Sequence, residues 1–120
     1  MRFFKCADCS SVLILDNAQE CCTNGWTELL ANTTDASGEK HVPVIETEGS
    51  MVTVTVGSVE HPMLDAHYIM WILIETSQGY QKKNLSPGEK PVARFSLAEG
   101  EQLAAAYEYC NLHGLWKAEA

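Results

Sequence analysis

Hydrophobic and polar residues alternate along much of the second part of the chain. In SMVTVTVGSV (50–59), valines stand at every second position and threonines lie between them. This pattern is typical of a β-strand with one buried face. Three more segments are rich in β-branched and aromatic residues and are also predicted to be strands: HVPVIE (41–46), YIMWILIE (68–75) and VARFSLA (92–98).

Two segments near the C-terminus extend this pattern. EQLAAAYEY (101–109) is ambiguous, because its alanines favour a helix whereas its larger apolar residues alternate as in a strand. GLWK (114–117) is a candidate last strand, and NLSPGEKP (84–91) is a turn by its proline and glycine content. Several short strands at this spacing predict a mainly β protein, an antiparallel sandwich.

The N-terminal part has a different composition. Residues 1–30 hold four of the five cysteines and one short apolar run, VLIL, so this segment is expected to need a metal, or docking to the rest of the chain, to stay folded. The small, polar segment ANTTDASG (31–38) is typical of a linker. We therefore predict an N-terminal metal domain (1–30), a linker (31–38) and a β-domain (39–120).

Charge and hydropathy limit the classes of partner. The formal net charge of −8 argues against binding to nucleic acid or to anionic membrane surfaces. The longest apolar run, YIMWILI, is much shorter than the roughly 20 residues of a membrane span. The N-terminus has no secretory signal pattern, and clustered cysteines suit a reducing compartment, so we expect a cytoplasmic protein.

The first cysteine cluster consists of CADC and ECC. Cys6 and Cys9 form a C-x-x-C step, and Cys21 and Cys22 are adjacent. A C-x-x-C turn lets two sulfurs converge on one tetrahedral ion, and a second pair completes the site. Four thiolate ligands are compatible with either iron or zinc, so the cysteines do not identify the metal.

A second set of candidate ligands lies in the β-domain. It contains all four histidines and the remaining cysteine: His41, His61, His67, Cys110 and His113. On one continuous strand, His61 and His67 would lie roughly 20 Å apart, so both reach one metal only if PMLDA (62–66) turns back between them. Cys110 and His113 form a C-x-x-H step that needs only a tight turn. From these residues alone, a single metal site shared by all five side chains is a hypothesis.

Four motifs built around these residues resemble the desulfoferrodoxin family of two-iron superoxide reductases, and the likeness covers essentially the whole chain. The motifs are EKHVPVIE (39–46), GSVEHPM (57–63), HYIMWI (67–72) and YCNLHGLWKAE (109–119). The N-terminal cysteine pairs are similar to desulforedoxin, a small iron–tetrathiolate protein.

The resemblance implies an immunoglobulin-like sandwich and a catalytic iron. It implies that His41, His61, His67 and His113 hold the iron in a plane, with the Cys110 thiolate axial. Lys40 is then expected to attract the anionic substrate and Glu39 to occupy the sixth position in the resting ferric state. A second iron, or zinc, is expected at Cys6, Cys9, Cys21 and Cys22.

The activity implied is the one-electron reduction of superoxide to hydrogen peroxide. The resemblance further implies a homodimer that takes electrons from rubredoxin. Two other functions remain open from the residues alone: a rubredoxin-like electron-transfer protein without catalysis of its own, and a zinc-stabilised interaction domain. Ferric thiolate sites are coloured and zinc sites are not, so a visible spectrum separates the last of these.

Overall fold

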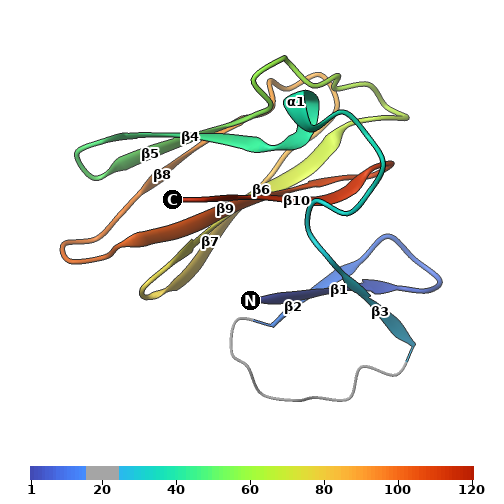
Figure 1. Cartoon of the computed structure of the whole chain (residues 1–120), viewed down its shortest axis with the longest axis horizontal. Coiled ribbons are helices and arrows are strands. Elements are labelled where there is room, and N and C mark those ends of the chain that lie inside the picture. Colours follow the sequence, from blue (N-terminus) through green and yellow to red (C-terminus); the bar gives the residue numbers. More distant parts are fainter. Residues whose placement is uncertain (16–24) are drawn as a thin grey trace. The chain divides into compact units, whose positions relative to one another are not determined.

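The computed structural model describes residues 1–15 and 25–120, and the chain divides into two compact units, Met1–Leu30 and Ala31–Ala120 (Figure 1). The first unit contains a three-stranded antiparallel sheet in the order β2-β1-β3. Its strands are β1 (Arg2–Cys6), β2 (Val12–Leu15) and β3 (Trp26–Leu29). The C-x-x-C step therefore begins at the last residue of β1.

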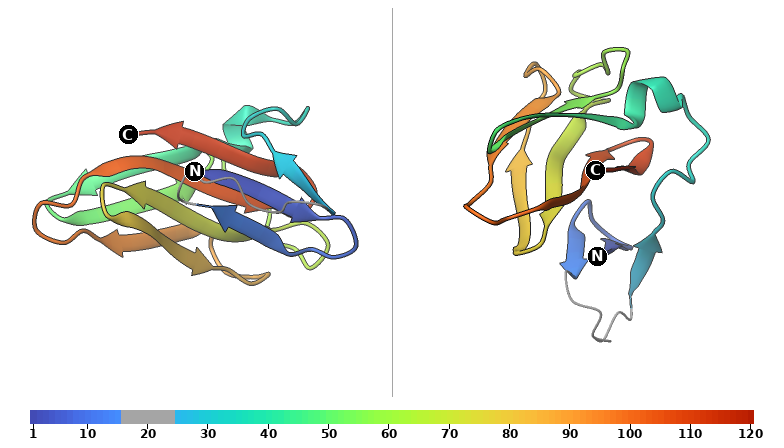
Figure 2. Two further views of the ribbon diagram at one scale, coloured as in Figure 1. Left: turned by 90° about the horizontal axis from the view of Figure 1, so that it is seen from below. Right: turned by 60° about the vertical axis from the view of Figure 1, so that its left-hand side comes forward.

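The second unit is a β-sandwich of two antiparallel sheets, with strand orders β4-β5-β8 and β10-β9-β6-β7. Its elements are α1 (Gly38–His41), β4 (Pro43–Glu48), β5 (Met51–Val56), β6 (Ile69–Thr76), β7 (Gly79–Asn84), β8 (Val92–Ser96), β9 (Leu103–Cys110) and β10 (Gly114–Glu119). The two layers face each other in the right-hand view of Figure 2. The predicted mainly β, antiparallel fold is confirmed, and a three-plus-four arrangement of strands is that of an immunoglobulin-like sandwich.

The core lies between the two sheets. From the β4-β5-β8 sheet it takes the three alternating valines of β5, all fully buried, and Phe95 of β8. From the other sheet it takes inward residues of β6 and β9, among them Ile72, Ile74 and Ala106. Alternation in β5 therefore buries the valines, as predicted, because each side chain of one face points between the sheets.

The ambiguous segment is a strand. β9 lies between β10 and β6 and pairs with both along its length. Its backbone bonds and the burial of Ala105 and Ala106 outweigh the helix propensity of alanine, which amounts to less than about 1 kcal/mol per residue. The predicted last strand is also confirmed, as β10.

Residues 31–37 precede α1, and Asn32 among them is bonded to β10. Asn32 has a positive φ of 62°. Its backbone N–H donates to the Leu115 carbonyl oxygen (3.0 Å), and its side chain exchanges hydrogen bonds with the backbone of Lys117. The one helix among the described residues, α1, has four residues, so no helix there could cross a membrane.

Candidate metal centre

His41 is positioned by the short helix α1. The Val42 N–H donates to the Gly38 carbonyl oxygen at 2.8 Å, which closes the single helical turn. The Glu39 carbonyl oxygen accepts from the Val59 N–H at 3.0 Å, so α1 is held against the segment that follows β5. His41, at the end of the turn, is 2% exposed.

Gly57 allows this close approach. It has a φ of +81°, and a Cβ placed on it would lie 2.7 Å from the Lys40 carbonyl carbon and oxygen and 2.5 Å from the Val59 oxygen. Real Cβ atoms do not come this close to backbone atoms, so only glycine fits both the conformation and the space. Gly57 therefore allows the backbone of Lys40, next to His41, to pack against the segment that follows β5.

The loop between β5 and β6 supplies two histidines. Leu64 and His67 form an isolated antiparallel bridge, in which each N–H donates to the other's carbonyl oxygen at 2.9 and 3.0 Å. The chain thus reverses at 64–67, and the rings of His61 and His67 lie 4.7 Å apart. The turn that the H-x5-H spacing requires is confirmed.

Cys110 and His113 lie on the hairpin that joins β9 to β10. Cys110 is fully buried at the end of β9, and Gly114 opens β10 with a φ of +77°. Asn111, between the two candidate ligands, fastens the hairpin to the neighbouring loop: its side chain donates to the Ala66 oxygen (3.1 Å) and accepts from the Tyr68 N–H (3.0 Å). These bonds hold His67 beside the hairpin.

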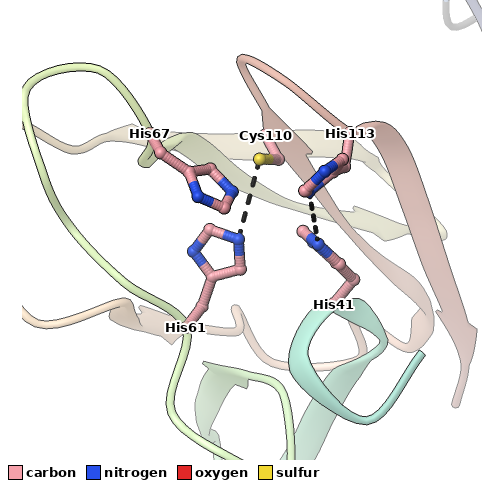
Figure 3. Close-up of side chains that lie close together, drawn as sticks. All are labelled: His41, His61, His67, Cys110 and His113. Carbon is pink, nitrogen blue, oxygen red and sulfur yellow. Dashed lines mark hydrogen bonds between the residues drawn. The ribbon is translucent and has the colours of Figure 1, made fainter. Parts of the chain in front are cut away.

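The structure brings all five predicted residues of this set together (Figure 3). Each offers one ligand atom, and the five atoms lie within 4.8 Å of one another: His41, His61, His67, Cys110 and His113. The His41 Nε2 and His113 Nδ1 atoms are 3.0 Å apart, and the Cys110 sulfur is 3.6 Å from His61 Nε2. Three separate segments of the chain therefore meet at one point.

These distances fit a metal ion. Two nitrogens bound at about 2.1 Å and at right angles on one ion are about 3 Å apart, which is the His41–His113 spacing. His67 Nε2 is buried without a hydrogen-bond partner among the described residues, as expected of a nitrogen directed at an ion. The His61 Nδ1 atom lies 2.7 Å from the Pro62 carbonyl oxygen, and such a bond leaves Nε2 free as the ligand.

The environment of His41, His61 and His67 favours the neutral imidazole, which is the form that binds metals. Burial, followed by repulsion from the other imidazoles and Lys40, lowers the pKa of His41 from 6.5 to about 4. Burial also lowers the pKa values of His61 and His67. Burial raises the pKa of the Cys110 thiol, so in the absence of a metal the thiol form is favoured, and metal binding is expected to release its proton.

A cavity of about 470 Å³ opens beside the cluster. Its lining includes His61, Lys40 and Lys90, together with the acidic residues Glu60 and Glu89. The other predicted catalytic residue, Glu39, is exposed and outside the five-residue cluster; its carboxylate accepts a hydrogen bond from the Ser37 hydroxyl at 3.4 Å. Lys40 thus lines the same cavity as His61.

Two buried side chains that the sequence analysis did not assign lie against the cluster. Trp116 stacks on His41, with ring centres 4.9 Å apart, and its indole N–H donates to the His113 carbonyl oxygen. Glu108 is fully buried, and its Oε1 atom lies 3.7 Å from His41 Nδ1. Strand alternation could have indicated Glu108, because it shares the inward face of β9 with Cys110.

The N-terminal cysteine site lies partly outside the described residues. Cys6 and Cys9 are free thiols, and a hydrogen bond from the Cys6 side chain is the largest contribution lowering the pKa of Cys9. The Cys6 N–H donates to the Ser11 oxygen at 3.0 Å, which closes the C-x-x-C turn. The other two predicted ligands, Cys21 and Cys22, lie in 16–24, outside the described residues.

Comparison with known proteins gives consistent matches along the chain. The family model described as Desulfoferrodoxin matches residues 33–119. A desulfoferrodoxin homolog from Archaeoglobus fulgidus is 41% identical over 98% of this chain and 95% of its own length. A desulfoferrodoxin from Syntrophotalea carbinolica is 44% identical, with 99% and 96% covered. The crystal structure of the superoxide reductase from Treponema pallidum is similar with a TM-score of 0.81 and 36% identity, covering 97% of this chain and 98% of that one.

Proposed function

Because the chain belongs to the desulfoferrodoxin family, we propose that it is a superoxide reductase, an oxidoreductase whose catalytic metal is an iron held by four histidines and one cysteine. The observation that carries the proposal is the convergence of His41, His61, His67, Cys110 and His113, whose ligand atoms lie within 4.8 Å of one another. The reaction joins one superoxide, one electron and two protons into one hydrogen peroxide.

The donor set supports a reactive rather than a structural metal. Structural zinc sites are usually closed by four ligands, whereas five protein donors leave one position of an octahedron open. Imidazole and thiolate together suit iron. When bound, the iron supplies a one-electron redox centre whose remaining position is open to a small anion.

The residues of the chain bring the substrate to this position. Lys40 lines the cavity beside His61, and its charge is strong enough there to contribute to the lowered pKa values of three imidazoles. We assign Lys40 to the attraction of superoxide and to holding a water molecule that donates a proton. Glu39, two residues before His41, is proposed to bind the metal at the open position in the resting enzyme.

The further parts of the assignment concern the second metal and the partners. We propose a second iron or zinc at Cys6, Cys9, Cys21 and Cys22; the closed C-x-x-C turn at Cys6 and Cys9 supports half of that site. The proposed domains are the metal domain 1–30, the linker 31–38 and the catalytic β-domain 39–120. We also propose a cytoplasmic homodimer that receives electrons from rubredoxin.

The test combines metal analysis, a visible spectrum and an electron count. The purified protein is expected to carry iron and, when oxidised, to show a thiolate-to-iron absorption band. With an external reductant it is expected to consume one electron for each superoxide removed. Superoxide removal without consumption of reductant would indicate dismutation and contradict the proposal, and so would a colourless zinc protein. Electron transfer without superoxide removal would favour a rubredoxin-like carrier.

A further inference from the structure

Glu108 is a carboxyl group buried in the core of the sandwich. It lies on β9, is 0% exposed, and shares the inward face of the strand with Ala106 and Cys110. Neither of its oxygen atoms has a hydrogen-bond partner among the described residues. Burying a polar group without a partner costs from one to several kcal/mol, and a buried charge costs more. A group of this kind calls for a specific reason.

The group that faces Glu108 is the outer nitrogen of His41. Glu108 Oε1 lies 3.7 Å from His41 Nδ1, and both side chains are almost completely buried. His41 Nδ1 also lacks a hydrogen-bond partner within the described part of the chain. Two buried, unpartnered polar atoms therefore face each other, and an approach of less than about 1 Å would form a hydrogen bond.

The remaining sides of the His41 ring are already occupied. Nε2 lies 3.0 Å from His113 Nδ1 inside the cluster, and one ring face stacks on Trp116 with an interplanar angle of 12°. Trp116 is also the cross-strand partner of Glu108 in the β9–β10 ladder. Neighbouring strands of one sheet thus supply both the stacking surface and the carboxyl group.

The protonation of the imidazole connects these contacts to metal binding. A neutral imidazole that offers Nε2 to a metal must carry its hydrogen on Nδ1. At His41 that N–H would point toward Glu108. The carboxyl group accepts this bond in either protonation state, because a protonated carboxyl still offers its carbonyl oxygen.

We propose that Glu108 is a positioning residue of the metal centre: it accepts the Nδ1–H of His41 and so holds the ring in the tautomer and orientation that present Nε2 to the metal. The inference rests on the proposed function for the existence of the metal site. It assigns to Glu108 no contact with substrate or metal.

Two substitutions at this position separate positioning from packing. Glu108→Gln keeps the length of the side chain and an oxygen acceptor, whereas Glu108→Leu keeps a similar volume and removes the acceptor. Ile74→Val is the control, because Ile74 is a fully buried inward residue of β6 outside the cluster. The three variants and the unmodified protein are loaded with iron, and metal release to a chelator is followed in time.

Glu108→Leu is expected to release iron about 10- to 100-fold faster than the unmodified protein, the usual effect of removing the partner of a ligating histidine. Glu108→Gln and Ile74→Val are expected to stay within about threefold of it. The metal-free Glu108→Leu protein is expected to unfold at a higher urea concentration, because leucine removes the cost of burying a carboxyl group. A packing role would instead change fold stability and metal retention in the same direction.

A second measurement reads the tautomer directly. In protein labelled with ¹⁵N-histidine and loaded with diamagnetic zinc, the Nδ1–H of His41 is expected to exchange slowly with solvent, and faster in Glu108→Leu. Metal release from Glu108→Leu at the unmodified rate, or equal impairment of the Gln and Leu variants, overturns the proposal. Neither readout uses superoxide, so an inactive protein that shows these differences would contradict the proposed function while leaving this inference standing.

Discussion

At the scale of single residues, the candidate centre combines neutral nitrogen donors with one sulfur. Burial lowers the pKa values of His41, His61 and His67 and raises that of Cys110, so the metal-free site carries little charge. The proposed ferrous ion, bound with a single thiolate, would give the site a net charge of about +1, which suits an anionic substrate. This local charge opposes the acidic balance of the whole chain.

The proposed role of the Cys110 sulfur as a metal ligand can be tested with the substitution Cys110→Ser. Serine has nearly the same size but does not form the thiolate that gives a ferric site its visible colour, so the absorption band and the superoxide reductase activity are both expected to disappear. The spectrum is best recorded in a Cys9→Ser background, which disrupts the proposed N-terminal thiolate site. A coloured, active double variant would contradict the assignment of Cys110 as a ligand.

Lys40 can be tested through the rate of superoxide binding. Lys40→Ala is expected to lower the second-order rate about tenfold and to flatten its dependence on ionic strength, because a positive charge beside the cavity steers anions. Pulse radiolysis measures both quantities. Lys82→Ala is the control: it removes the same charge from β7, where Lys82 lies over the Trp71 ring. Equal rates for the Lys40 variant and the unmodified protein would remove Lys40 from the mechanism.

At the scale of elements, the candidate ligands come from the connections between strands. His41 precedes β4, His61 and His67 lie between β5 and β6, and the C-x-x-H step joins β9 to β10. Strands of the two facing sheets carry these connections to the same end of the sandwich. Local structure then orients the candidate ligands. His41 lies on a single helical turn, the loop with His67 is closed by a bridge of two hydrogen bonds, and the hairpin of the C-x-x-H step has a glycine at positive φ.

Gly57 provides a test of this arrangement. Gly57→Ala is expected to lower the free energy of unfolding by about 3 kcal/mol, because left-handed strain of roughly 1–2 kcal/mol adds to overlap with the Lys40 and Val59 backbone. Iron retention is expected to fall as well, since α1 and His41 must move. Urea denaturation and metal analysis measure the two effects.

Gly49→Ala is the matched control for this substitution. Gly49 also has a positive φ, 60°, but a Cβ there would meet no atom within 4 Å. Its cost is expected to be the conformational strain alone, about 1 kcal/mol, with iron retention unchanged. Similar losses in the two variants would show that the approach of Gly57 to Lys40 is not tight.

At the scale of the whole molecule, the buried histidines couple folding to pH. The unfolded chain binds protons on its histidines below pH 6.5, whereas folded His41 stays neutral down to about pH 4. Unfolding therefore takes up protons in this range, and the free energy of unfolding falls as the pH falls. His41 alone contributes a slope of roughly 1.4 kcal/mol per pH unit.

This dependence is expected in urea titrations of the metal-free protein between pH 6.5 and 4.5. Glu108 acts in the opposite direction, because burial raises its pKa well above 4.5, so acid favours its folded, protonated form. The slope is therefore expected to be steeper in Glu108→Gln. The carboxylates with lowered pKa values, Glu28 and Glu101, lose their contributions only below pH 4.5. Stability that rises as the pH falls through this window would contradict the assignment of neutral histidines.

The sequence by itself determined five strands of the sandwich (β4, β5, β6, β8 and β10), the antiparallel fold class and the family. Alternation in 50–59 is a local property, since each residue's face follows from its neighbours, and the structure buries the valines as expected. The histidine and cysteine motifs were also visible in the sequence, and the family they resemble is the one to which the chain belongs.

The tertiary structure decided what depends on distant parts of the chain. EQLAAAYEY is a strand because β6 and β10 pair with it on both sides, which no local propensity encodes. The five candidate ligands meet because strand register and sheet packing bring three connections to one point. The place of Glu108 against His41 follows from the same packing: a glutamate among apolar residues is recognisable in the sequence, but the group that it faces belongs to a segment 67 residues away.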